Sequence, residues 1–155
     1  PNICKRNEFA WDEKGYYINQ KAFIIPRASK YLLGVLNSSI VMWLFDKLLA
    51  KLQNDFYEPS SIFMKDFPIP NASLEQQKTI ETLVDQILTL KKENPQAHII
   101  PLEAKIDGLV AHLYGLTEEE FDVILKDLNL PDPVRVGAAN AYRDVALESK
   151  GTTHE

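Results

Sequence analysis

The stretch Tyr31-Leu-Leu-Gly-Val-Leu-Asn-Ser-Ser39 predicts two consecutive helices with a short break between them. Its apolar residues recur at helical spacing, and Ser29 just before it can cap the first helix. The run Asn37-Ser38-Ser39 interrupts the pattern, and either serine can cap a second helix, which we expect to end before Gln53. Gly34 lies inside the first helix, where glycine costs about 1 kcal/mol relative to alanine, so we expect that close packing requires it.

Short runs that favour β-strands precede this helix pair. Phe9-Ala-Trp11 and Tyr16-Tyr-Ile18 are rich in aromatic residues, which fit strands. Between them, Asp12-Glu-Lys-Gly15 ends in a glycine that suits a hairpin loop. Ala22-Phe-Ile-Ile25 is typical of a further strand that ends at Pro26. The sequence therefore predicts a β-hairpin followed by a third strand.

The segment after the helix pair favours extended structure. Residues 62–64 favour a short strand, and Phe67-Pro-Ile-Pro70 contains two prolines, which restrict it to an edge strand or an extended connector. This connector leads into the second half of the chain.

Further helices are predicted beyond residue 72. Ser73 and Gln76 form a capping box for a helix that runs to about Lys92. Pro101 suits the start of the next helix, over residues 102–114, and the two helices could pair as an antiparallel hairpin.

A second capping box opens a third, shorter helix. Thr117 and Glu120 form this box, and Asn129 ends the helix. Pro131 and Pro133 then begin a tail, whose end at residues 148–155 we expect to be disordered.

These elements predict an α+β fold. We expect a small strand-rich part with two helices at residues 1–72 and a helical part at residues 73–130, made of the antiparallel hairpin and the short helix. Residues 131–155 are expected to form a partly disordered tail.

Composition limits the classes of protein to which the chain can belong. At 155 residues and 45% hydrophobic, it suits one compact domain, or a domain with an appendage. Its longest apolar run is far shorter than the roughly 18 residues of a membrane span, and residues 1–20 lack the apolar core of a secretory signal. The single cysteine, Cys4, excludes an internal disulfide and favours a cytoplasmic location. Because the chain does not begin with methionine, we expect it to be a fragment of a larger protein.

Charge is distributed unevenly along the chain. The net charge of −5 is unlike that of a typical nucleic-acid-binding domain, which is basic. Residues 1–70 carry nine Lys and Arg against seven Asp and Glu, a net charge of +2, whereas residues 71–155 carry eight against fifteen, a net charge of −7. Since phosphate contact requires only local positive potential, any DNA contact is expected in the first half. On charge alone, a value of +2 is equally compatible with chance variation.

Patterns typical of catalytic or metal sites are missing from the sequence. His98, His112 and His154 are scattered, and the acidic run Glu118–Glu120 suits the first turn of a helix. Asn94-Pro95-Gln96 lacks the second proline and the aromatic residue of the Asn/Asp-Pro-Pro-Tyr/Phe signature of amino-methyltransferases. We therefore predict no catalytic residue, no metal site and no cofactor in this chain.

Recognition is the function that the side chains of the first half suit. Lys and Arg can hold phosphates or bind the edge of guanine, and Asn and Gln can form paired hydrogen bonds with adenine. On composition alone, an ordinary solvated surface explains the same side chains. The candidate DNA-binding residues are Lys5, Arg6, Lys14, Tyr16, Tyr17, Asn19, Gln20, Lys21, Arg27, Lys51, Gln53, Asn54 and Lys65.

An alternative function is protein docking or dimerisation through the second half. An apolar stripe runs along the predicted helix of residues 74–92, opposite a second stripe in residues 102–113. The stripe consists of Ile80, Leu83, Val84, Ile87 and Leu90. Both functions can coexist in one chain, with DNA contact in the first half and docking in the second.

The order of four segments resembles the TaqI-like carboxy-terminal specificity domain of type IIG restriction enzymes and related adenine-specific DNA methyltransferases. The segments are Phe9–Tyr17, Ala22–Ile25, Tyr31–Ser38 and Phe67–Pro70. Residues 75–88 and 102–119 are similar to the helices at the end of such enzymes, so that the resemblance covers about residues 1–128.

This resemblance implies a sequence-specific DNA recognition module from a bacterial restriction-modification system. It would direct an upstream adenine-specific methyltransferase, a type II endonuclease, or both, to their site. The parent would use S-adenosylmethionine and possibly Mg²⁺, while this chain would itself be no enzyme. The implied partners are double-stranded DNA and the upstream domains, with no membrane.

Overall fold

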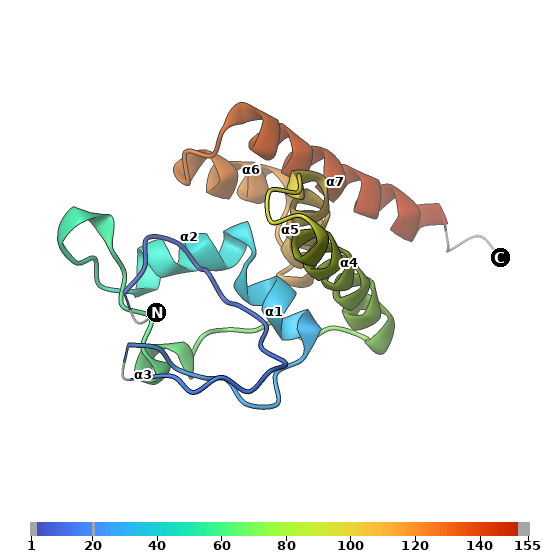
Figure 1. Ribbon diagram of the computed structural model, residues 1–155. Coiled ribbons are helices and arrows are strands. Elements are labelled where there is room, and N and C mark those ends of the chain that lie inside the picture. Colours follow the sequence, from blue (N-terminus) through green and yellow to red (C-terminus); the bar gives the residue numbers. More distant parts are fainter. Residues whose placement is uncertain (1–2, 20, 152–155) are drawn as a thin grey trace.

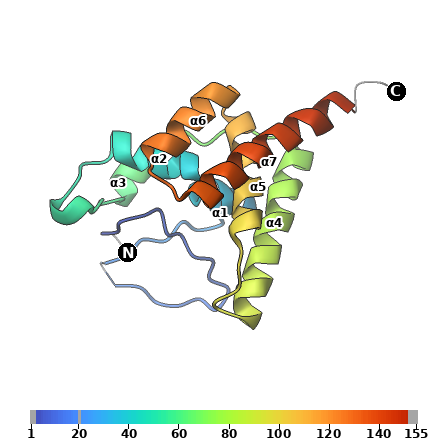
Figure 2. The same ribbon diagram turned by 90° about the horizontal axis from the view of Figure 1, so that it is seen from above.

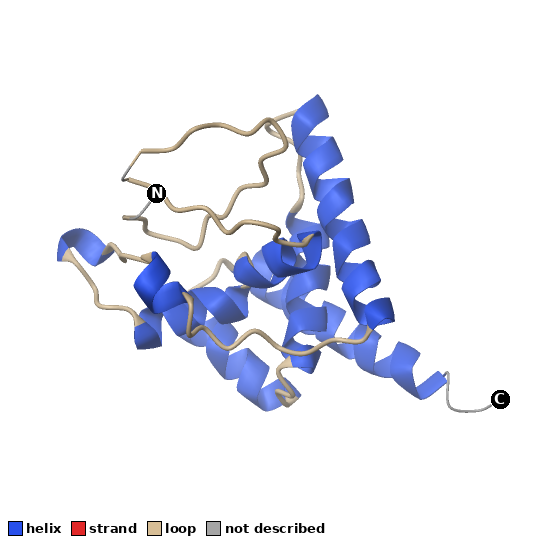
Figure 3. Cartoon of the chain, turned by 90° about the horizontal axis from the view of Figure 1, so that it is seen from below, coloured by secondary structure: helices blue, strands red, loops and turns tan. Residues whose placement is uncertain are grey.

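The computed structural model describes residues 3–19 and 21–151, and within these ranges the chain is helical, without a β-strand (Figures 1 and 3). A short 3₁₀-helix lies at Gln53–Asp55. The α-helices are α1 (Lys30–Leu36), α2 (Ser39–Leu48), α3 (Ser61–Met64), α4 (Leu74–Glu93), α5 (Ile100–Leu113), α6 (Glu118–Asp127) and α7 (Asp132–Gly151).

The predicted α+β class is therefore wrong. The three strand-like runs before residue 26 are irregular, and residues 62–64 lie in α3. A preference for strands is realised only where a partner strand offers a surface to pack on. In the predicted hairpin, the Asp12 carboxylate instead accepts the backbone N–H groups of Lys14 and Tyr16, both at 2.8 Å. This local turn occupies amides that a strand ladder would need.

The helix pair around residues 31–39 forms as predicted. The Ser29 hydroxyl accepts the Leu32 N–H at 3.1 Å, and Ser38 caps α2. Close packing requires glycine at position 34, as predicted, because a Cβ atom there would lie 2.6 Å from Cγ2 of Ile80 in α4. Glycine lets α1 and α4 approach closely.

Both predicted capping boxes are present, at Ser73 and Gln76 of α4 and at Thr117 and Glu120 of α6. α4 and α5 are in contact, as the predicted hairpin requires, but α4 packs mainly against α1, and α5 packs mainly against α7. A Cβ atom at Gly108 of α5 would lie 2.7 Å from the backbone nitrogen of Tyr142.

The segment predicted as a tail is helix α7 over most of its length. Pro133 lies in the first turn, where proline is tolerated, so it opens this helix and does not prevent it. Ala138, Ala141 and Tyr142 recur at helical spacing and are buried. Of the residues expected to be disordered, 148–151 belong to α7, and 152–155 lie outside the described residues.

One hydrophobic core joins the two halves of the chain. Val35, Phe45, Ile80, Val110 and Phe121 come from five helices and are almost fully buried. This core continues from α1 and α2 into α4, α5 and α6, so the helices of both halves form one body.

Two tyrosines hold the connector at residues 67–70. The hydroxyl of Tyr31 in α1 donates to the Pro70 carbonyl at 2.6 Å, and that of Tyr114 after α5 donates to the Pro68 carbonyl at 2.7 Å. Burial raises the pKa of Tyr114 to about 12, so this hydroxyl stays protonated and remains a donor. Residues 67–70 form no strand, so the edge strand, one of the two forms predicted for them, is wrong.

The irregular segment before α1 lies on the side of the molecule away from α6 and α7 (Figures 1 and 2). The loop between α2 and α3 projects at the far end of α2 in the same views. None of the described helices is long and apolar enough to cross a membrane.

Candidate functional site

The irregular segment of residues 3–28 is held on the helices by side-chain amides. Nδ2 of Asn7 donates to the carbonyl oxygens of Leu36 and Ser38, each at 2.8 Å. These carbonyls belong to the end of α1 and to the cap of α2, and the Asn7 side chain between them is only 8% exposed. The segment is thereby fixed at the junction of the two helices.

A second amide, that of Asn37, binds the same segment two residues further on. Its Oδ1 accepts the Phe9 N–H at 2.9 Å, and its Nδ2 donates to the Phe9 carbonyl at 3.0 Å. The Phe9 ring lies edge-on to Phe45 of the core, with ring centroids 6.4 Å apart, and to Phe23 of the returning limb, at 6.2 Å. Phe9 therefore links both limbs of the loop to the helical body.

Between these limbs lies a loop in which residues 12–19 and Lys21 have exposed side chains. Tyr17 is fully exposed, at 103%, and Tyr16 and Ile24 are also largely exposed. The Asn19 carboxamide accepts the Lys21 N–H at 2.9 Å and stabilises a turn. The loop thus presents aromatic, amide and basic groups to solvent.

The basic residues of the first half divide into two groups. One group makes no ion pair with any side chain that the structure describes, and it consists of Lys5, Arg6, Lys14, Lys21 and Arg27. In the other group, Nζ lies near a carboxylate: Lys30 with Asp85 at 2.5 Å, Lys47 with Asp127 at 2.7 Å, Lys51 with Asp46 at 2.6 Å and Lys65 with Asp66 at 4.0 Å. The unpaired group is the one free to attract anions.

Lys51 belongs to a structural network and is therefore a weaker candidate than the sequence indicated. The Asp46 carboxylate accepts Lys51 and also the Tyr57 hydroxyl, the latter at 2.8 Å. The Lys51 ammonium, followed by the Tyr57 hydroxyl, lowers the pKa of Asp46 to about 2.

The loop of residues 51–57 lies beside the beginning of the described chain. Cys4 and Tyr57 exchange two backbone hydrogen bonds, at 3.0 and 2.8 Å. Nζ of Lys5 lies 5.0 Å from the centroid of the Phe56 ring. Gln53 and Asn54 of the loop are exposed.

The predicted DNA-binding residues thus gather at two loops. One holds Lys14, Tyr16, Tyr17, Asn19 and Lys21, and the other holds Lys51, Gln53 and Asn54 next to Lys5. Arg6 and Arg27 are exposed, Lys65 lies beyond α3, and Gln20 is outside the described residues. Two grooves of the molecule, one lined by residues between Thr82 and Leu102 and one by residues between Glu118 and Arg143, include none of these candidate residues.

Comparison with known proteins shows which family the segment that carries these loops resembles. Residues 1–69 match the family model of the TaqI-like C-terminal specificity domain. Residues 1–69, here called the specificity domain, are therefore similar to this family over somewhat less than half of the chain. The specificity domain spans the irregular segment, α1, α2 and α3, and it includes every candidate DNA-binding residue.

A curated relative extends the similarity beyond the specificity domain. DNA methyltransferase A of Bacillus subtilis (strain 168) is 30% identical over 121 residues, which is 67% of this chain and 14% of the relative. The chain thus spans only a small part of the length of that protein. No solved structure matches the chain.

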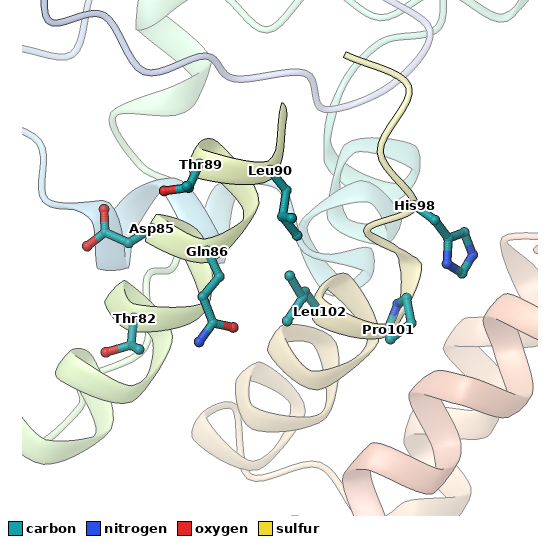
Figure 4. Close-up of a pocket in the computed structure, with 8 residues that line it drawn as sticks. All are labelled: Thr82, Asp85, Gln86, Thr89, Leu90, His98, Pro101 and Leu102. Carbon is teal, nitrogen blue, oxygen red and sulfur yellow. The ribbon is translucent and has the colours of Figure 1, made fainter. Parts of the chain in front are cut away.

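The apolar stripe predicted for docking is largely covered within the chain. Ile80 and Val84 are buried under α1, Leu83 and Ile87 are half-buried, and Leu90 remains 38% exposed. Leu90 lines an open groove between α4 and α5 with a volume of about 620 Å³ (Figure 4). Figure 4 shows Leu90 and Leu102 projecting into the gap between the two helices.

Sequence reasoning missed the residues that hold the specificity domain together. The Asn7 amide and the carbonyls it binds are 29 and 31 residues apart in sequence, so no local pattern indicates this contact. Asn37 could have been noticed because it stands at a helix break, where its side chain is free to bind a neighbouring backbone.

A buried carboxylate connects the specificity domain to α5. The Asp107 carboxylate accepts the Ser39 N–H at 2.7 Å and the Ser39 hydroxyl at 2.5 Å, at the first turn of α2. Burial outweighs these hydrogen bonds and raises the pKa of Asp107 to about 6.

His112 of α5 packs against α7. A ring nitrogen of His112 lies 2.8 Å from the Tyr142 carbonyl, and the His112 ring stacks on the Tyr142 ring. In the described ranges, no three His, Cys, Asp or Glu side chains lie close enough to hold a metal ion.

Proposed function

We propose that this chain is the DNA target-recognition module of a larger restriction-modification enzyme. The observation that carries the proposal is the set of five unpaired basic side chains, together with exposed Tyr16 and Tyr17, on a TaqI-like C-terminal specificity domain. DNA would approach the side that carries residues 3–28, away from the acidic helix α6 (Figure 1).

The two kinds of side chain would have separate roles in this interface. The five cations would bind phosphates, which position the protein without reading sequence. Asn19, Gln53 and Asn54 would form hydrogen bonds with base edges, for which their amides are suited. The surrounding tyrosines can contact sugars and thymine methyl groups.

Chemistry would belong to the rest of the parent polypeptide. We assign to it an adenine-specific methyltransferase that uses S-adenosylmethionine, and a type II endonuclease activity with Mg²⁺ as in type IIG enzymes. The relative named DNA methyltransferase A supports a methyltransferase parent, because this chain corresponds to only 14% of its length.

Selection of duplexes from a random-sequence pool at low salt tests the proposal. We expect one short motif to be enriched. The affinity for it should fall steeply with salt. If all five cations bind phosphates, the logarithm of the binding constant should fall against the logarithm of the salt concentration with a slope of about −4.5. Lys14→Ala should reduce the slope by about 1. The matched control Lys126→Ala, in α6, should leave it unchanged. Recovery of no motif together with a flat salt response would refute the proposal.

A second candidate function is docking of the helical part onto upstream domains of the parent, for which the α4–α5 groove is the supporting observation. Light scattering of the chain alone and mixed with those domains tests it. A strict monomer without affinity for them would remove this candidate.

A further inference from the structure

We propose that Asn37 and Asn7 are positioning residues that orient the DNA-contacting loop of residues 12–21 on the helical body. This inference rests on the proposed function for the identity of the ligand. Its geometric part stands on contacts within the chain and can be tested without DNA.

The two amides form a reciprocal connection between the irregular segment and the α1–α2 junction. Asn37, at the junction, pairs with both backbone groups of Phe9, at 2.9 and 3.0 Å. Asn7, in the segment, donates to the Leu36 and Ser38 carbonyls of the junction, both at 2.8 Å. Each side therefore satisfies backbone groups of the other, as a neighbouring strand would do in a sheet.

The position of these contacts determines what they control. They lie just before the chain leaves the helices, and residues 12–19 beyond them are exposed. The Phe9–Phe23 ring pair and Trp11, which packs against the core with its ring centroid 5.7 Å from Lys30 Nζ, are further contacts beside the loop. The hydrogen bonds of Asn7 and Asn37 fix the backbone from which the loop leaves the body.

Specificity should depend on this orientation more than affinity does. Attraction between cations and phosphates acts over several ångströms and tolerates small displacements. Hydrogen bonds to base edges require donors and acceptors at defined positions. Releasing the loop should therefore impair discrimination between sequences before it impairs binding to random DNA.

The test compares variants of the 155-residue chain on the selected duplex and on a random duplex. Asn37→Ala removes both contacts with Phe9, and Asn37→Asp keeps the acceptor but loses the donor. Asn71→Ala, at an exposed asparagine between residue 70 and α4, is the matched control. The measured quantity is the ratio of the dissociation constants for random and selected DNA.

We expect Asn37→Ala to lower this ratio by about tenfold, a loss on the scale of one base contact. The random-duplex affinity should stay within about twofold of that of the unmodified chain. Asn37→Asp should be intermediate, and Asn71→Ala should match the unmodified chain. Equal discrimination by Asn37→Ala and the unmodified chain would overturn the inference. If Asn37→Ala lowers helix content, the same criterion applies to Asn37→Asp.

Hydrogen exchange at the Phe9 amide separates this inference from the proposed function. We expect fast exchange in Asn37→Ala and slow exchange in the unmodified chain. Unchanged protection would show that Asn37 does not hold the segment, which overturns the inference whatever the DNA result. A chain that selects no motif would refute the proposed function instead, and the exchange experiment would still decide whether the amide contact exists.

Discussion

At the scale of single residues, the surroundings of two glycines show how closely α5 and α7 approach each other. A Cβ atom at Gly108 would meet the backbone of α7, at 2.7 Å from the Tyr142 nitrogen and 2.8 Å from the Ala141 carbonyl carbon. A Cβ atom at Gly137 would lie 3.6 Å from its nearest neighbour, Cβ of Ala104, which is an ordinary contact.

These distances predict opposite effects for two alanine substitutions. Gly108→Ala should lower the free energy of unfolding by about 2–3 kcal/mol, because the backbone of α7 must move. Gly137→Ala should raise it by about 0.5–1 kcal/mol, because it gains helix propensity without a clash. Urea denaturation followed by circular dichroism measures both. A Gly108→Ala variant as stable as the unmodified chain would contradict the close approach of α5 and α7.

Asp107 makes stability depend on pH in the direction opposite to that of most carboxylates. Its pKa is raised by burial to about 6 from 3.8, so the folded state binds a proton between these values and the unfolded state does not. Stability from this group is therefore gained as pH falls from about 7 to 4, by up to about 3 kcal/mol.

Asp107→Asn should remove this gain. Compared with the unmodified chain, we expect the variant to have its highest relative stability near pH 7. Near pH 4.5, where the unmodified chain has gained stability by protonating Asp107, this relative stability should be lower. Thermal unfolding across this range provides the measurement. Parallel pH profiles for the two proteins would show that the Asp107 pKa is not raised.

At the scale of elements, helices with local signals could be predicted and elements that need distant partners could not. Ser73 with Gln76, and Thr117 with Glu120, define helix starts through contacts three residues apart, and both boxes exist. The strand predicted at Tyr16–Ile18 required a partner strand, and neither Tyr16 nor Tyr17 has one in the described structure. Pro131 and Pro133 led to the prediction of a tail in place of α7. The small residues Ala138 and Ala141 recur at helical spacing, but they indicate a helix only once α5 is known to pack against them.

The helical state of α7 leads to a prediction that a tail would not make. Truncation after Pro131 should uncover the face of α5 around Gly108 and lower the melting temperature by more than about 10 °C. The control Val136→Ser changes a side chain of α7 that is 50% exposed and should have little effect. A truncated chain that melts like the full one would show that α7 does not stabilise the fold.

At the scale of the whole molecule, the chain has two differently charged sides joined by one core. Residues 1–70 carry a net charge of +2, and residues 71–155 carry −7. The sequence predicted this division and the family, because both depend on residue order along the chain. It did not predict which cations are free, because Lys30 and Lys47 find their carboxylates on α4 and on α6.

The sequence was enough to predict the family but not the shape of the candidate DNA interface. The order of the four segments between Phe9 and Pro70 was sufficient to indicate the family, and the match to its model over residues 1–69 confirms this resemblance. The shape of the candidate interface depends on contacts such as those of Asn7, whose partners lie about thirty residues away in sequence. These contacts could be found only in the folded chain.

The central claim is that residues 3–28 and the loop of residues 51–57 contact DNA. Hydrogen–deuterium exchange of the chain with and without its selected duplex tests this most directly. We predict that DNA slows exchange in these two segments and leaves α6 and α7 unchanged. Protection concentrated in α6 and α7, or no protection under conditions in which the duplex is bound, would contradict it.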